Sequence, residues 1–164
     1  MNKNVLLSFM IGCYLLPILM VCYQYQSNPS VSNLICDETC KDSILFFMGL
    51  MGGGTLLYEW KRNDRYSQVC IGILLIGLYG LICINESHSV HYVFAFLVFT
   101  TILCFMIRHC YVTKCNSILS ASLFIQILVL LFVVSNINET IFYPEVIYIL
   151  NFAFYYLYLH AISP

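Results

Sequence analysis

The sequence predicts an all-α, polytopic membrane protein: one domain over residues 1–164, built as a compact six-helix transmembrane bundle. Three observations lead to this fold class. Hydrophobic residues make up 61% of the chain and charged residues only 9%, whereas about 25% of a soluble domain is charged. Apolar stretches recur along the whole length, each close to the roughly 20 residues that a helix needs to cross the hydrocarbon core. Basic residues gather between alternate stretches, as the connections of a multi-span protein require.

The apolar stretches define the expected spans. They cover residues 4–24, 44–60, 68–84, 91–107, 117–134 and 142–160. The first stretch follows Lys3 and is similar to a signal peptide, but its apolar run is long for one and no Ala-x-Ala cleavage site follows it, so we interpret it as an uncleaved anchor. The connections are mostly short, which predicts that consecutive helices are antiparallel neighbours.

The distribution of Lys and Arg predicts the orientation. Six of the seven basic residues fall on one face if the six spans alternate, and only Lys41 falls on the other. The six are Lys3, Lys61, Arg62, Arg65, Arg108 and Lys114. An excess of basic residues marks the cytosolic side, so both termini are expected in the cytosol. Two glycosylation sequons, at Asn85 and Asn138, fall on the opposite, external face, where N-glycans are added.

Four of the nine cysteines lie in connections rather than in apolar stretches. Cys36 and Cys40 share the first external connection, where an oxidising lumen permits a disulfide between them. Cys110 and Cys115 flank the cytosolic end of the fourth span. They are expected either as free thiols or as sites of reversible palmitoylation.

Two amides lie close to the middle of their spans. Gln126 belongs to the fifth stretch and Asn151 to the sixth. An amide in hydrocarbon needs a partner, and antiparallel neighbours place these two at one depth. We therefore expect an interhelical hydrogen bond between them, worth about 0.6–2 kcal/mol.

Glycines crowd the second and third stretches. Gly49-x-x-x-Gly53 matches the small-residue packing pattern, with Gly52 and Gly54 beside it. The third stretch continues the series with Gly72, Gly77 and Gly80. In lipid, helices associate through close backbone approach. The pattern predicts close packing of spans two and three, and the alternatives are homo-oligomerisation through these spans or a notch for a lipid headgroup.

A histidine pair opens the fourth span. His88 and His91 are three residues apart, which can place both on one face of a helix start. They form a polar cap at the interface, or a sensor of acidity, since the ordinary pKa of histidine is about 6.5. A metal site would require further ligands, such as Cys36, Cys40 or Glu86, and we predict neither a metal nor a cofactor.

Several functional classes are disfavoured. The net charge of -1 leaves no basic surface for nucleic acid. No span carries an ionisable residue near its centre, as transport pathways usually do. The chain contains none of the common hydrolase motifs, so no catalytic residue is predicted.

The third and fourth spans resemble the damage-regulated autophagy modulator family, a group related to proteins of GPI-anchor remodelling. The matching positions include Gly72, Gly77 and Leu78 in IGILLIGLYGLI, then Val90-His91, Ala95 and Phe99 at the start of the fourth span. Glu145, at the start of the last span, is similar to the family's final segment. The resemblance implies a non-enzymatic multi-span protein of lysosomal or other endomembranes, with His91 and Glu145 as the positions to test.

The function we predict is therefore that of a membrane-embedded regulator or scaffold of lipid or autophagic membranes, with membrane lipids as its partners. One alternative is a lipid-modifying enzyme that uses His91, His88 and Glu86 as external polar groups. Another is a small transporter or channel subunit. Lysosomal or other endomembranes are expected rather than the plasma membrane.

Overall fold

The computed structural model describes residues 3–23, 30–31, 38–85, 87–136 and 141–162. These residues form helices, and none of them forms a strand. The helices are α1 (Lys3–Tyr23), α3 (Glu38–Arg62), α4 (Arg65–Cys83), α5 (Ser89–Val112), α6 (Ser117–Ser135) and α7 (Phe142–Ile162). The predicted all-α bundle is confirmed, and each helix overlaps one predicted apolar stretch.

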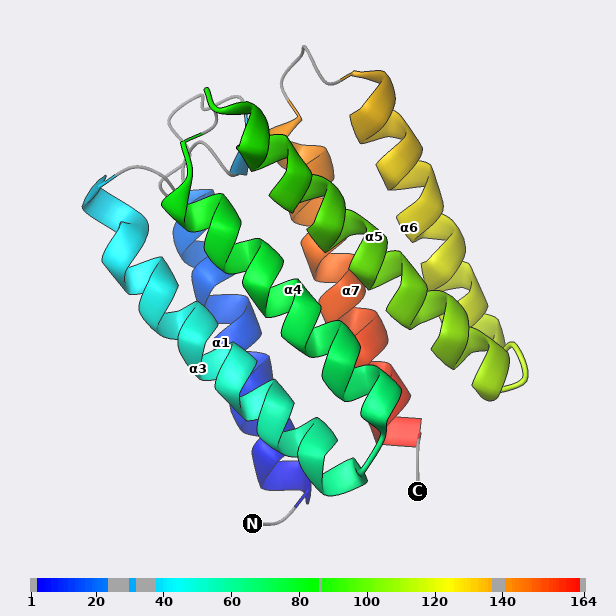
Figure 1. The fold of residues 1–164 in the computed structure, drawn as a ribbon. Coiled ribbons are helices and arrows are strands. Elements are labelled where there is room, and N and C mark those ends of the chain that lie inside the picture. The colour runs from blue at the N-terminus through cyan, green and yellow to red at the C-terminus, as the bar shows by residue number, and fades with distance from the viewer. Residues whose placement is uncertain (1–2, 24–29, 32–37, 86, 137–140, 163–164) are drawn as a thin grey trace.

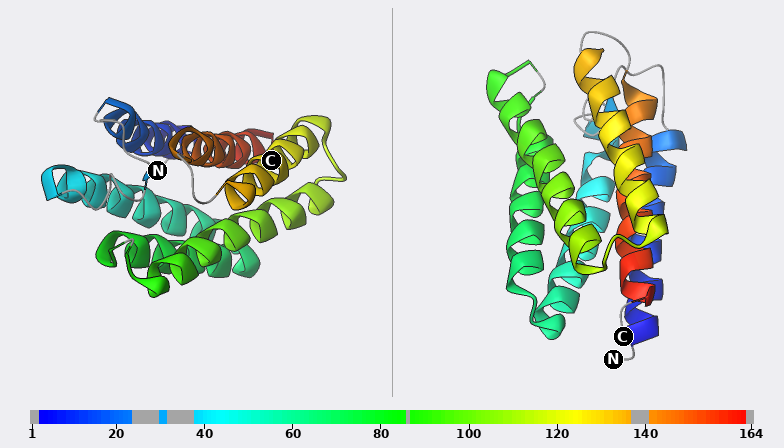
Figure 2. Two further views of the ribbon diagram at one scale, coloured as in Figure 1. Left: turned by 90° about the horizontal axis from the view of Figure 1, so that it is seen from above. Right: turned by 90° about the vertical axis from the view of Figure 1, so that its right-hand side faces the viewer.

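The helices form two layers. Seen along the bundle, α1, α7 and α6 make one row, and α3, α4 and α5 make the other (Figure 2). Both termini lie at one end of the bundle, together with the α3–α4 and α5–α6 turns (Figure 1). We call this the terminal end. The α4–α5 turn lies at the opposite end (Figure 1).

Four of the described helices, α4 to α7, are long and apolar enough to cross a membrane. Helix α1 contributes a shorter apolar segment, Asn4–Met20, and α3 carries charged residues at both of its ends. Large apolar side chains cover the outside of the helices, as shown by Phe96 at 72% exposure and Phe124 at 62%. A soluble monomer rarely exposes such a continuous apolar surface. The chain is therefore an integral membrane protein.

Capping residues start α4 and α6 at the terminal end. The Asp64 side chain accepts a hydrogen bond from the Tyr66 backbone N–H and starts α4, and Asn116 does the same for Ile118 at the start of α6. Short polar side chains satisfy the free N–H groups of a first turn. The two turns are consequently tight and bring α3 against α4 and α5 against α6.

Two tyrosines of α7 set the register between α7 and α5. The Tyr148 hydroxyl donates to the Phe99 carbonyl at 3.0 Å, and the Tyr155 hydroxyl donates to the Met106 carbonyl at 2.7 Å. Both pairs are separated by 49 residues in the chain, so the two contacts repeat one alignment of two parallel helices. Both tyrosines are almost fully buried, and sliding α7 along α5 would break both hydrogen bonds together.

The glycines of α4 permit close contact with α5. A Cβ at Gly80 would lie 2.3 Å from the Phe94 ring, and one at Gly77 would lie 2.7 Å from Val98 Cγ2. Between α3 and α4, a Cβ at Gly52 would lie 2.4 Å from Leu75. Close packing of spans two and three thus holds at Gly52, and α4 uses its own glycines chiefly against α5.

The Gly49-x-x-x-Gly53 pattern does not mediate this packing. Both glycines are exposed on α3, and a Cβ at either would meet nothing within 4 Å. The prediction that this pair packs α3 against α4 is wrong, because α3 turns Gly52 rather than Gly49 and Gly53 toward its neighbour. A role for the exposed pair in homo-oligomerisation stays a prediction.

Gly80→Ala is expected to lower the free energy of unfolding by about 1–3 kcal/mol, the usual cost of forcing a methyl group into a packed core. The control is Gly72→Ala in the same helix, because a Cβ at Gly72 meets nothing within 4 Å. Denaturation of the purified protein in detergent, followed by circular dichroism, measures both. Equal stability of the two variants would contradict the packing at Gly80.

Candidate functional site

The expected amide pair is present between α6 and α7. The Asn151 side-chain N–H donates to Gln126 Oε1, and Gln126 Nε2 donates to the Tyr148 carbonyl at 3.1 Å. Ser122 completes the network: its hydroxyl donates to Asn151 Oδ1 and its carbonyl accepts from Asn151 Nδ2, both at 2.8 Å. Gln126 is fully buried. The network holds α6 against α7, and it gives hydrogen-bond partners to Ser122 and Gln126, two polar side chains of the apolar helix α6.

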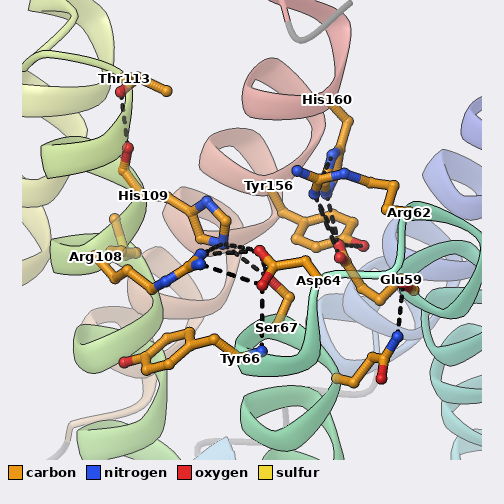
Figure 3. Close-up of polar contacts among 12 residues, drawn as sticks. Glu59, Arg62, Asp64, Tyr66, Ser67, Arg108, His109, Thr113, Tyr156 and His160 are labelled. Carbon is orange, nitrogen blue, oxygen red and sulfur yellow. Dashed lines mark hydrogen bonds and ion pairs between the residues drawn. The ribbon is translucent and has the colours of Figure 1, made fainter.

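A first charged cluster joins α4 to α5 at the terminal end. Arg108 binds Asp64 through both terminal nitrogens, at 2.8 and 3.2 Å, and its guanidinium lies 4.6 Å from the centre of the Tyr66 ring. The Ser67 hydroxyl donates to Asp64 Oδ2 at 3.0 Å and contacts His109 Nε2 at 2.8 Å (Figure 3). We call Asp64, Ser67, Arg108 and His109 the Asp64 cluster.

The electrostatics of this cluster keep Asp64 ionised. Partial burial raises the pKa of Asp64, but the hydrogen bonds from Ser67 and Arg108 and the charge of Arg108 outweigh it, so its pKa falls below the usual value of 3.8. Each of these groups favours the carboxylate form. Asp64 therefore caps α4 and binds Arg108 as a full negative charge.

The Asp64 cluster contains Asp, Ser and His, but these residues do not have the hydrogen-bond geometry of a catalytic triad. In a triad the histidine takes the proton of the serine while the carboxylate holds the other side of the imidazole. Here the carboxylate and the hydroxyl lie on the same side of the imidazole. His109 Nε2 is 2.8 Å from the Ser67 oxygen, 3.9 Å from Asp64 Oδ2 and 3.5 Å from Arg108 Nη1. Asp64 therefore does not hold the opposite nitrogen of the ring, as the carboxylate of a triad does.

A second charged cluster joins α3 to α7. Glu59 and His160 are both fully buried, with 3.0 Å between Glu59 Oε1 and His160 Nε2. The Tyr156 hydroxyl donates to the same oxygen at 2.7 Å, and Arg62 Nη1 lies 3.3 Å from both carboxylate oxygens (Figure 3). We call Glu59, Arg62, Tyr156 and His160 the Glu59 cluster. It places a buried carboxyl group inside the bundle with three partners around it.

The contacts of His160 determine which nitrogen carries the proton. Arg62 Nη1 lies 3.2 Å from His160 Nδ1, and a guanidinium can only donate. Nδ1 therefore accepts, and the proton of the neutral ring sits on Nε2, facing Glu59. Glu59 Oε1 lies 3.0 Å from this nitrogen, so the two groups are in close electrostatic contact.

Aromatic rings enclose the Glu59 cluster. The His160 ring packs edge-on against Tyr156 at 4.2 Å and Tyr58 at 4.6 Å between centres. Tyr14 of α1 stacks on Tyr156 at 6.4 Å. Water is thus kept from Glu59, which strengthens its attraction to Arg62. The residues of the two clusters belong to α3, α4, α5, α7 and the α3–α4 turn, and α4 also reaches α3 through a hydrogen bond from Gln68 to the Glu59 carbonyl.

The polar residues that the sequence singled out as candidate functional groups have separate roles. His91 is buried, and its Nδ1 lies 2.8 Å from the Ile84 carbonyl, so its ring closes the C-terminal end of α4. His88 is exposed and precedes α5 without a side-chain cap. Glu145 Oε2 accepts from the Val31 backbone N–H at 2.6 Å. The expected histidine pair therefore does not share one site, because one ring points inward and the other outward.

The remaining predicted sites are only partly described. Asn85 is exposed and its side chain accepts from the Ser87 backbone N–H, which leaves its glycosylation a prediction. Cys115 is exposed, whereas Cys110 is buried with its sulfur 3.3 Å from the Ser120 hydroxyl. Asn138, Glu86 and the Cys36–Cys40 pair lie outside the residues, or the side chains, that the structure describes. Within the described part, no group of three or more metal-binding side chains comes together.

Sequence reasoning missed the Glu59 cluster. Neither Glu59 nor His160 is among the residues that the sequence singles out. The signal available was helical spacing: Glu59 and Arg62 are three residues apart, and Tyr156 and His160 are four apart, so each pair shares one helix face. Arg108 marks the orientation in the sequence, and the structure adds the pairing of Arg108 and His109 with the start of α4.

Comparison with protein-family models, with curated proteins and with solved structures finds no match to this chain.

Replacing Glu59 alone is expected to be more harmful than replacing Glu59 and His160 together. Glu59→Leu leaves Arg62, Tyr156 and His160 without their acceptor, and breaking a buried ion pair costs about 3–5 kcal/mol. Adding His160→Phe removes one buried polar ring that has lost its partner, and is expected to restore part of the free energy of unfolding. Denaturation in detergent, followed by circular dichroism, measures it.

The matched control is Lys61→Leu, which removes an exposed charge from the same turn of α3 and is expected to change stability by less than about 1 kcal/mol. A double variant no more stable than Glu59→Leu would show that the cluster does not act as one unit.

Proposed function

We propose that this chain is a non-enzymatic six-span membrane protein that regulates or scaffolds lipid or autophagic membranes. The observation that carries the proposal is the use of the buried polar groups. The amide network, the two α7 tyrosines and both charged clusters bind one helix to another. Such an interior supports a rigid scaffold more directly than a reaction centre, whose acid and base groups must be free to meet a substrate.

The arrangement of charge supports cytosolic termini. Lys61, Arg62 and Arg65 surround the α3–α4 turn, and Arg108 and Lys114 surround the α5–α6 turn. Both turns lie at the terminal end with the two chain ends (Figure 1). Basic residues of short connections are retained in the cytosol. In the proposed topology all six helices cross the bilayer, so α3 places its charged ends at the two interfaces.

The apolar outer surface supports membrane lipids as the partners. The resemblance to the damage-regulated autophagy modulator family favours lysosomes or other endomembranes as the location. The alternative of a lipid-modifying enzyme is less well supported, because the ring of His91 is engaged by the Ile84 carbonyl and His88 lies apart from it.

Epitope tags at both termini are expected to bind antibody once the plasma membrane alone has been permeabilised. A tag inserted after Ser87, in the α4–α5 turn, is expected to bind only after all membranes are opened. Immunofluorescence with lysosomal, endoplasmic-reticulum and plasma-membrane markers measures access and location together. Termini protected behind an intact organelle membrane would overturn the topology.

The regulatory role predicts that removing the chain slows or accelerates delivery of an autophagic cargo reporter to lysosomes, and that His91→Gln restores it fully. Glutamine retains a donor for the Ile84 carbonyl, so a structural His91 tolerates the change. The control is His88→Gln at equal expression. Unchanged delivery without the chain would count against the role, and failure of correctly folded His91→Gln to restore delivery would favour chemistry at that histidine.

A further inference from the structure

An apolar cavity of about 160 Å³ lies between the two layers of the bundle. Its walls come from α1 and α7 on one side and from α3, α4 and α5 on the other. The lining includes Ile18, Met51, Leu78, Ala95, Val98 and Ile149. Most of these residues belong to the half of their helix that lies away from the terminal end. Tyr14 and Phe152 also line the cavity and separate it from Tyr156 of the Glu59 cluster.

A contact between two segments distant in sequence lies at the outer end of the cavity. Val31 and Glu145 both line the cavity, and the Val31 N–H donates to the Glu145 carboxylate at 2.6 Å. Val31 is also buried in a small apolar cluster with Phe142 and Val146. Among the described residues, the groups at this end of the cavity are therefore bound to one another.

The polar atoms beside the cavity already have partners. The Tyr148 hydroxyl is bound to the Phe99 carbonyl and Glu145 is bound to Val31. Apart from the ring of Tyr14, the remaining surface is hydrocarbon from Leu, Ile, Val, Phe, Met, Ala and Pro side chains. A cavity lined in this way does not hold water but accepts apolar molecules. Two methionines, Met48 and Met51, add flexible walls that adapt to the shape of an occupant.

We propose that this cavity binds the end of one acyl chain of a membrane lipid. The inference rests on the proposed membrane-spanning function, because the surrounding solvent is then hydrocarbon and lipid tails lie at this depth. Size selects among apolar occupants: an engineered protein cavity of about 150 Å³ holds one benzene, which corresponds to a chain end of roughly six carbons. A sterol ring system is several times larger.

The test is photolabelling of the full chain in phosphatidylcholine vesicles. The probe is a phosphatidylcholine with a diazirine near the terminal methyl of one acyl chain, and adducts are located by mass spectrometry. We expect adducts on cavity residues such as Ala95 and Ile149, in addition to outward-facing ones such as Phe96. Ala95→Phe places a benzene-sized ring in the cavity and should reduce the cavity adducts at least fivefold. Ala95→Leu is a milder second variant if the first does not fold.

The matched control is Ala121→Phe, on an exposed position of α6, which should leave the cavity adducts unchanged. Adducts confined to outward-facing residues would overturn the inference, as would cavity adducts that persist in a folded Ala95 variant. Labelling of the cavity by a diazirine sterol would also overturn it. If the epitope tags place both termini in the cytosol and the α4–α5 turn on the other side, but the cavity stays unlabelled, only this inference fails. If the tags contradict that topology, the proposed function fails first.

Discussion

The alignment of α7 with α5 is the constraint on which the rest of the structure depends. Two hydroxyls seven residues apart on α7 bind two carbonyls seven residues apart on α5. Because hydrocarbon offers no competing donor or acceptor, a buried hydroxyl loses a hydrogen bond whenever the register changes. The alignment fixes where Asn151 faces α6 and where Tyr156 and His160 face α3. The amide network and the Glu59 cluster are therefore possible only in the register that the tyrosines set.

The same register divides the bundle into two unlike halves. Toward the terminal end, Phe105, Phe152 and Tyr156 fill the space between the layers, with ring centres 5.7–6.2 Å apart. The Asp64 and Glu59 clusters, the second of which includes Tyr156, lie at this end and join α3, α4, α5 and α7 through charge-assisted contacts. In the other half the side chains between the layers are mainly aliphatic, and they leave the cavity. Rigidity and charge thus lie at one end, and unfilled apolar space lies at the other.

Prediction from sequence succeeded where one helix at a time decides the outcome. Apolar runs determine the helices. An amide in the middle of a span needs a hydrogen-bond partner, so Gln126 and Asn151 could be paired from their equal depth in the membrane alone. It failed where the rotation of a helix about its axis matters. Gly49 and Gly53 match a packing pattern, yet α3 turns Gly52 inward, and only contact with α4 and α1 decides that rotation. His160 escaped notice because its partner Glu59 lies 101 residues earlier in the chain, with three helices, α4, α5 and α6, between them.

The Glu59 cluster shows why span-end charges carry more information than orientation. A buried ion pair contributes little net stability, since removing two charged groups from water offsets most of their attraction. What it contributes is selectivity: every arrangement of α3 and α7 that separates Glu59 from Arg62 and His160 leaves a charge in an apolar interior. Apolar packing alone tolerates many rotations of a helix, because one aliphatic side chain replaces another at little penalty. A bundle whose exterior is uniformly apolar has few other means of distinguishing its correct packing, and the charged clusters supply that distinction at the end where the chain begins and ends.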